Sequence, residues 1–262
     1  MGRRSQELVD YERVAALYEE GRALPAQVLA RWGDAVRPYL PAGTRRLLDL
    51  GAGTGIFARA WPGWTHATVV ALEPSAAMIL AVARKDPGVT FIRGVAEDLP
   101  LRHRTMNVVW ISTALHHFAD LDRALAEIER VLDPAGRVLV RTYAPGRTEM
   151  TWADEFPGRA KWQTRFHTEH ELATAFEGHG FELIDSRDVL EWTETYADSA
   201  RWVTRMRHAD SMLTALTDEE IDAGTAALRS QPSKIGQLEV TLFVFGHRPQ
   251  AATHSNAPHH DA

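Results

Sequence analysis

The sequence predicts an α/β domain, and three observations carry that prediction. An apolar run at residues 47–50 breaks into the glycine loop Gly51-Ala52-Gly53-Thr54-Gly55 and continues as a helical stretch over Ile56–Trp61. Three further apolar runs follow, at 69–73, 89–93 and 106–111. Stretches with a helical pattern of apolar residues separate the later apolar runs, which is typical of parallel strands joined by helices. A chain of 262 residues suffices to bury the core of one such domain.

Composition narrows the class of partner. The formal net charge is −6 and no block of lysine and arginine occurs, which argues against a nucleic acid and favours a small molecule. The absence of cysteine excludes disulfides and thiol chemistry. The first residues are polar and no apolar run approaches 18 residues, so we expect no signal peptide, no membrane contact and a cytoplasmic location. Three lysines against 26 arginines indicate a GC-rich bacterial genome.

Two helices are predicted before the first strand. Over 6–22, Tyr11, Ala15, Tyr18 and Arg22 recur on one helical face. Pro25 opens a second helix with Leu29, Trp32 and Val36 on one side, and 41–43 is a turn. We expect residues 1–40 to form a helical cap.

The glycine loop is predicted to hold a ligand, because a side chain there would collide with it. Its spacing is G-x-G-x-G, which differs from the dinucleotide and P-loop patterns. Asp49 at the strand end would repel a pyrophosphate but could accept hydrogen bonds from an ammonium group. A tight turn in any α/β protein is the alternative interpretation.

The second strand ends at Glu73, about 20 residues past the glycines, where such folds bind ribose hydroxyls. The third is followed by 94–101, which includes Glu97 and Asp98, and the fourth by Ser112-Thr113-Ala114-Leu115-His116-His117-Phe118. With these four motifs in order, residues 11–181 closely resemble the class I S-adenosylmethionine-dependent methyltransferases that modify small molecules, including the ubiquinone and menaquinone biosynthetic enzymes.

This resemblance implies a Rossmann-like, seven-stranded doubly wound sheet of order 3-2-1-4-5-7-6 with the last strand antiparallel, and S-adenosylmethionine as cofactor. It assigns the ribose to Glu73, the adenine to Pro74, Met78 and Asp98, and the methionine carboxylate to Tyr18 and Arg22. Met78 could equally be core, and 97–100 could be a simple acidic turn. The full predicted cofactor set is Tyr18, Arg22, Asp49, Gly51, Ala52, Gly53, Gly55, Glu73, Pro74, Met78, Ala96, Glu97, Asp98, Ser112, Thr113 and His117.

The loop after the fourth strand faces the transferable methyl group in similar enzymes. It carries no acidic cluster for magnesium, and adjacent histidines on a helix point about 100° apart, so we expect no metal. His116 or His117 is the candidate general base, because imidazole titrates near neutral pH. Alternatively, one of the pair shapes the cofactor pocket or caps the next helix.

A helix over 120–132 follows, with Asp120 as its N-cap, and the turn 133–136 leads into a strand over 137–143. Arg141 departs from an apolar parallel strand. It either binds an acidic group of the substrate or pairs with a buried acid, and the sequence leaves both open.

The remaining chain predicts a helix over 168–177, antiparallel strands over 181–190 and 237–245, and a tail at 249–262 that we expect to be disordered. Two inserts, 144–167 and 191–236, are candidate lids within one domain of residues 1–248. Their aromatic residues suggest a flat or apolar acceptor, although self-packing is the alternative. The candidate acceptor-binding residues are Tyr11, Arg141, Trp152, Phe156 and Trp202.

We therefore expect methyl transfer to a small, aromatic or heteroaromatic acceptor in bacterial natural-product metabolism. The methylated atom, carbon, nitrogen or oxygen, stays open, as does a homodimer. The alternatives are a cofactor-binding protein without turnover and a nicotinamide-dependent oxidoreductase. The second would need a catalytic Tyr-x-x-x-Lys, and none of the three lysines has a tyrosine at that spacing.

Overall fold

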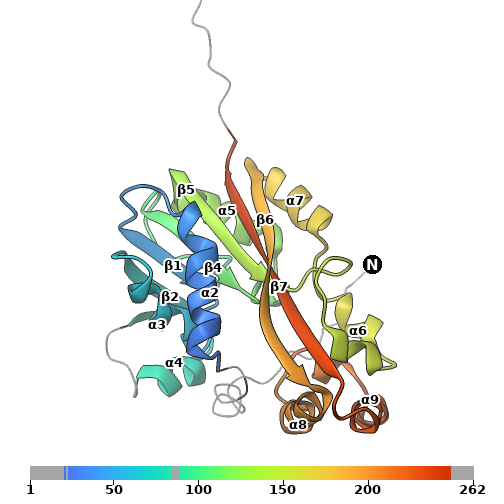
Figure 1. Cartoon of the computed structure of the whole chain (residues 1–262). Coiled ribbons are helices and arrows are strands. Elements are labelled where there is room, and N and C mark those ends of the chain that lie inside the picture. Colours follow the sequence, from blue (N-terminus) through green and yellow to red (C-terminus); the bar gives the residue numbers. More distant parts are fainter. Residues whose placement is uncertain (1–20, 22, 84–88, 249–262) are drawn as a thin grey trace, which may run out of the picture.

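A seven-stranded sheet of order β3-β2-β1-β4-β5-β7-β6 forms the centre of the molecule (Figure 1). This computed structural model describes residues 21, 23–83 and 89–248. Strands β1 to β5 run parallel, and β7 runs antiparallel to both of its neighbours, β5 and β6. The strand order predicted from the sequence is confirmed. The strands are β1 Arg46–Leu50, β2 Thr68–Glu73, β3 Thr90–Arg93, β4 Met106–Ser112, β5 Leu132–Thr142, β6 Phe181–Thr195 and β7 Ile235–His247.

Helices lie on both sides of this sheet and at its lower right in Figure 1. They are α2 Ala26–Val36, α3 Ile56–Ala60, α4 Ala76–Ala83, α5 Leu121–Val131, α6 Arg159–Gln163, α7 Glu169–Glu177, α8 Tyr196–Met206 and α9 Asp218–Ser230. Short 3-10 turns are η1 Arg37–Tyr39, η2 Trp61–Gly63, η3 Leu115–His117, η4 Thr151–Glu155 and η5 Leu213–Ala215. The helix predicted over 6–22, with Tyr11, Tyr18 and Arg22, and the predicted tail lie outside the described residues.

Alternate residues of β1, β4, β5 and β7 pack into two separate cores, one on each face of the sheet. Val108 and Trp110 of β4 pack with α2 and α3 on one face, while Val109 and Ile111 pack with α5 and α7 on the other. This period of two is the geometry of a strand whose side chains point to opposite faces. The sheet is therefore buried on both sides, as parallel sheets require.

Capping residues fix where two covering helices begin. The Asp120 side chain accepts a hydrogen bond from the Arg123 amide at 3.0 Å, which confirms the predicted N-cap of α5. Thr168 and Glu171 form a capping box at the start of α7. Such caps satisfy amides that have no partner within the helix.

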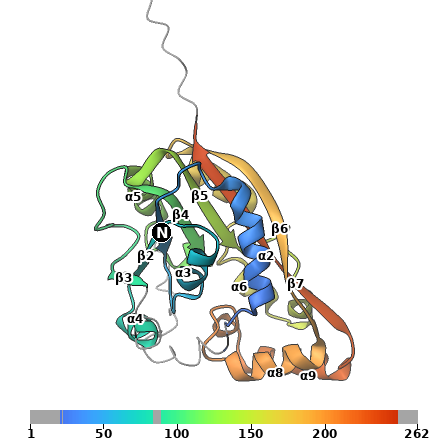
Figure 2. The ribbon, with the colours of Figure 1, turned by 60° about the vertical axis from the view of Figure 1, so that its left-hand side comes forward.

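The two inserts build a third core of their own. Residues of η4, α6, α8 and α9 pack together around Trp152, Trp162, Met206 and Ile221. Figure 2 shows α8 and α9 side by side at one end of the molecule, where β6 and β7 reach them. Within the described residues no helix combines the length and apolar character needed to span a membrane.

Strand β6 is longer than the sequence predicted. It continues from Leu190 to Thr195, and its pairing with β7 shifts register between Leu183 and Asp185 and again between Leu190 and Trp192. Each shift inserts an extra residue, which breaks the alternation of apolar and polar positions. The alternation of apolar and polar residues therefore ends at Leu190, although the strand continues to Thr195.

Candidate functional site

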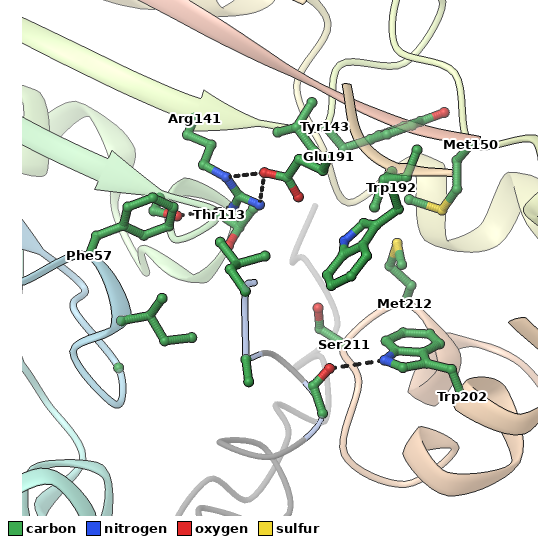
Figure 3. A pocket seen from close by; sticks show the side chains of 18 of the residues that line it. Phe57, Thr113, Arg141, Tyr143, Met150, Glu191, Trp192, Trp202, Ser211 and Met212 are labelled. Atoms are coloured by element: carbon green, nitrogen blue, oxygen red, sulfur yellow. Dashed lines mark hydrogen bonds and ion pairs between the residues drawn. The ribbon is translucent and has the colours of Figure 1, made fainter. Parts of the chain in front are cut away.

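A cavity of about 590 Å³ lies at the carboxyl ends of β1, β4 and β5, beside the inserts (Figure 3). The loop after β1 and the loop after β4 form one side of it. Strands β6 and β7, helix α8 and the residues around η4 and η5 supply the opposite side. Ligands of doubly wound folds bind at this edge of the sheet, near the point where the strand order reverses. This cavity is the candidate site.

The glycine loop takes backbone angles that favour glycine. The φ angles of Gly51, Gly53 and Gly55 are 73°, 55° and 72°. A Cβ atom on Gly51 would lie 2.6 Å from the Cβ of Ala114, whereas one on Gly53 would meet no atom of the described residues within 4 Å. Gly53 lines the cavity, so its open side is free for a ligand to approach.

Asp49 is a carboxylate enclosed in the wall of this cavity. It is 1% exposed, and its Oδ2 atom has no hydrogen-bond partner among the described residues. Burial, and secondarily the charge of Glu73, raises the pKa of Asp49 to about 8. A cation that enters the cavity would stabilise the ionised form of Asp49.

Glu73 lies against the glycine loop. Its two carboxylate oxygens accept hydrogen bonds from the backbone amides of Gly53 at 2.8 Å and Ser75 at 3.0 Å. The side chain is 7% exposed and is not part of the cavity lining. It therefore holds the end of β2 and the glycine loop together at the place where the sequence predicted ribose recognition.

The other predicted adenine-side residues lie beyond the cavity as well. Met78 and Ala96 are buried, and Asp98 is exposed. The carboxylate of Glu97 accepts from the amides of Ala119 at 2.7 Å and Asp120 at 3.2 Å. Pro74 and Gly55 are also absent from the cavity lining, while Asp49, Gly51, Ala52, Gly53, Ser112, Thr113, His116 and His117 belong to it.

The loop after β4 is strained where it meets the cavity. Thr113 has a φ of 49°, which is rare for a β-branched residue, and its amide donates to the Arg141 carbonyl at 2.7 Å. The ring of His116 lies 3.9 Å from that of His117 and 4.4 Å from that of Phe166, between centroids. Both histidines line the cavity.

Arg141 pairs with an acid that sequence analysis did not single out, Glu191 of β6. The two are 6% and 3% exposed. Arg141 donates from Nε to the Glu191 Oε1 atom at 2.7 Å and also from Nη2, and Trp32 Nε1 donates to the same oxygen at 2.6 Å. Arg141 Nη1 also donates to Ser112 Oγ at 3.1 Å. Of the two alternatives for Arg141, pairing with a buried acid is the one observed.

Aromatic and sulfur-containing side chains form the far end of the cavity. Figure 3 shows Trp192, Trp202, Met150 and Met212 around it. Trp202 Nε1 donates to the Gly21 carbonyl at 3.0 Å, and the rings of Trp202 and Trp152 are 5.7 Å apart. The predicted Trp152 and Trp202 therefore line the cavity. Phe156 does not, because its ring packs against Gly224 of α9.

Several residues of this cavity were not predicted as site residues from the sequence: Tyr143, Met150, Phe166, Glu191, Trp192 and Met212. One of them could have been noticed in the sequence. Glu191 is an acidic residue that directly follows the alternating pattern of the predicted strand and precedes Trp192. In the part of the chain that the structure describes, no three histidine or acidic side chains are grouped to hold a metal ion.

Comparisons with known proteins fit this geometry. A family model described as a methyltransferase domain matches residues 48–140. An uncharacterized methyltransferase of Mycobacterium tuberculosis is 36% identical over 105 residues, which cover 40% of this chain and 42% of that protein. A malonyl-acyl-carrier-protein O-methyltransferase of Halorhodospira halophila is 33% identical over 139 residues, 52% of this chain and 47% of that protein.

Among solved structures, a putative methyltransferase from an antibiotic biosynthesis pathway of Anabaena variabilis superimposes with a TM-score of 0.65 at 19% identity. The match covers 84% of this chain and 97% of that one, and it establishes a shared fold. The chain spans about half the length, or less, of the two curated relatives.

Proposed function

This chain belongs to the class I S-adenosylmethionine-dependent methyltransferases, and on that premise we propose that it transfers a methyl group to a small acceptor. The family and its cofactor, S-adenosylmethionine, are those predicted from the sequence motifs. The observation that carries the proposal is the buried Asp49 beside an open glycine loop at the edge of the sheet.

The residues present fit this cofactor. The Oδ2 atom of Asp49, without a partner among the described residues, is available to an ammonium group. The open side of Gly53 leaves room for the adenosine portion, with Glu73 directly behind it. A pyrophosphate would meet the acidic side chains of Asp49 and Glu73 here, and no lysine is among the described residues that line the cavity, which argues against a dinucleotide.

When bound, the cofactor supplies an electrophilic methyl group on a sulfonium, whose transfer forms a bond to the acceptor and leaves the electron pair of the broken carbon–sulfur bond on sulfur. The chain's own work is to orient the acceptor and to exclude water. The strained Thr113 and the two histidines line the cavity. His116 or His117 stays the candidate general base.

We further propose an aromatic or heteroaromatic acceptor, because several tryptophan, tyrosine and methionine side chains lie in the far wall, beside charged residues of α8. The Anabaena variabilis protein is described as part of an antibiotic pathway, which supports a natural-product acceptor. We also propose a cytoplasmic location and no nucleic-acid or membrane partner, on the support of the net charge of −6 and the lack of a lysine and arginine block; a homodimer stays open.

Two measurements test the function. Calorimetric titration should show binding of S-adenosylhomocysteine and no binding of NADH. Incubation with methyl-labelled S-adenosylmethionine and a panel of phenols, aromatic amines and heteroaromatics should then give a labelled product. Cofactor binding without transfer to any acceptor would instead indicate a protein of this fold without turnover, and NADH binding would favour an oxidoreductase.

A further inference from the structure

Glu191 occupies a bulge that turns two consecutive side chains toward the cavity. Leu190 pairs with Glu239 of β7 and Trp192 with Leu238, so Glu191 is the extra residue between them. Neighbouring residues of a regular strand point to opposite faces, yet Glu191 and Trp192 both line the cavity. Bulges commonly re-aim side chains next to active sites.

The two oxygens of this carboxylate have different environments. Oε1 accepts three hydrogen bonds, two from Arg141 and one from Trp32. Oε2 accepts none from the described residues. Figure 3 shows one oxygen of Glu191 against Arg141 and the other directed toward the cavity. The side chain is thus fixed at one end and presents a hydrogen-bond acceptor at the other.

The surroundings of Oε2 determine what it can bind. Trp192 is adjacent, and Met150, Met212 and Trp202 lie around the same end of the cavity. The positive charge of Arg141 is already engaged by Glu191, so Arg141 offers little to an anionic ligand at this point, and the other arginines of the lining, Arg201 and Arg205, lie on α8. An aromatic body bearing an N–H or O–H group fits this combination of a flat apolar wall and one oriented acceptor.

We propose that Oε2 of Glu191 binds the N–H or O–H group of the acceptor and so selects protic aromatic compounds over aprotic or acidic ones. This inference rests on the proposed function, since it names the acceptor class of the same site. It assigns to Glu191 a binding role that the sequence pattern did not indicate.

Matched naphthalene probes test the proposal on the full-length chain, by calorimetry with S-adenosylhomocysteine present at saturation. 2-Naphthol, which donates a hydrogen bond, should bind about tenfold or more tightly than 2-methoxynaphthalene, which only accepts one, or 2-methylnaphthalene. 2-Naphthoate should bind more weakly than 2-naphthol. Equal affinities, or a preference for the naphthoate, would overturn the proposal, and this ranking needs no variant.

The variant Glu191→Gln sharpens the test. Three donors hold the oxygen of the new amide, so its NH2 group must face the cavity and turn an acceptor into a donor. The preference for 2-naphthol should fall to about threefold or less and shift toward 2-methoxynaphthalene. Glu239→Gln, on β7 opposite Leu190 and outside the cavity lining, should keep the native ranking.

Binding of S-adenosylhomocysteine distinguishes a failure of the proposed function from a failure of the role proposed for Glu191. S-adenosylhomocysteine should bind the Glu191→Gln variant within about twofold of the native chain. A tenfold loss would show that Glu191 supports the cofactor half or the fold, against the proposal. If the native chain fails to bind S-adenosylhomocysteine, the proposed function fails instead, while the probe ranking, repeated without it, still decides the role of Glu191.

Discussion

At the scale of single residues, the site depends on carboxylates placed where water cannot reach them well. Asp49 lies near the end of β1, between the buried Leu48 and Leu50, and folding buries it close to the charge of Glu73. Desolvation and a like charge both penalise its ionised form, which raises its pKa to about 8. Binding of a cation next to Asp49 should therefore cause this residue to lose its proton.

This raised pKa predicts a pH-dependent cofactor affinity. The contribution of Asp49 to stability is fully present below its ordinary pKa of 3.8 and is lost as pH rises through about 8, because the folded state retains the proton longer. A bound ammonium favours the ionised carboxylate, so S-adenosylhomocysteine should bind more tightly from about pH 6 to about pH 8, by up to about tenfold per unit. Calorimetry at several pH values measures this.

The control for that experiment is Asp49→Asn, which is close in shape and does not titrate. It should bind S-adenosylhomocysteine more weakly at pH 8 and with a much flatter pH dependence. An equally steep dependence in the variant would assign the effect to another group.

Glu73→Ala should weaken binding of S-adenosylhomocysteine by about 1.5 to 3 kcal/mol, the usual contribution of a hydrogen bond to a charged group. The carboxylate also holds the amides of Gly53 and Ser75, so part of this loss reflects the glycine loop. Titration calorimetry gives the affinity, and urea unfolding gives the accompanying change in stability. An unchanged dissociation constant would contradict the ribose assignment.

At the scale of elements, close helix contacts decide which aromatic residues face the cavity. Helix α9 approaches η4 so closely that a Cβ atom on Gly224 would lie 2.3 Å from a ring carbon of Phe156. This contact keeps Phe156 in the core of the insert. Trp152, four residues earlier, is left to line the cavity.

Gly224→Ala should therefore destabilise the protein by about 1 to 3 kcal/mol, because the buried ring of Phe156 must move. Denaturant unfolding measures the loss. Gly178→Ala at the end of α7 is a matched control, since its nearest contact would be an ordinary 3.4 Å and its φ is −59°. That change should be neutral or stabilise by up to about 1 kcal/mol. Equal effects of the two changes would show that the contact with Phe156 does not limit packing.

At the scale of the whole molecule, the cavity joins two differently built halves. The parallel sheet presents the glycine loop and the loop after β4, and the inserts with β6 and β7 present the aromatic wall. Figures 1 and 2 show the parallel strands on one side of the molecule and β6, β7, α8 and α9 on the other. A ligand that touches both halves is expected to stabilise the native state relative to the unfolded chain.

S-adenosylhomocysteine at a concentration 100 times its dissociation constant should add about 2.7 kcal/mol to the free energy of unfolding. For a chain of this size that corresponds to a rise in melting temperature of roughly 5 to 10 °C. Differential scanning fluorimetry measures the shift, with NADH as the comparison. A shift with NADH alone would contradict the cofactor assignment.

The sequence by itself determined what depends on neighbouring residues. Apolar residues that recur every two positions located most strands, and those that recur every 3.6 positions located most helices. The glycine loop, Glu73 and the loop after β4 indicated the family and its cofactor. The N-cap at Asp120 was also readable, because a cap is set within one turn of helix.

Only the tertiary structure decided what depends on distant parts of the chain. Arg141 meets Glu191 across 50 residues and Trp32 meets it across 159, and the bulge in β6 that aims Glu191 at the cavity breaks the very pattern by which a strand is recognised. Likewise, whether Trp152 or Phe156 faces the cavity depends on how closely α9 packs. Local periodicity carries no information on such contacts, because packing between elements creates them.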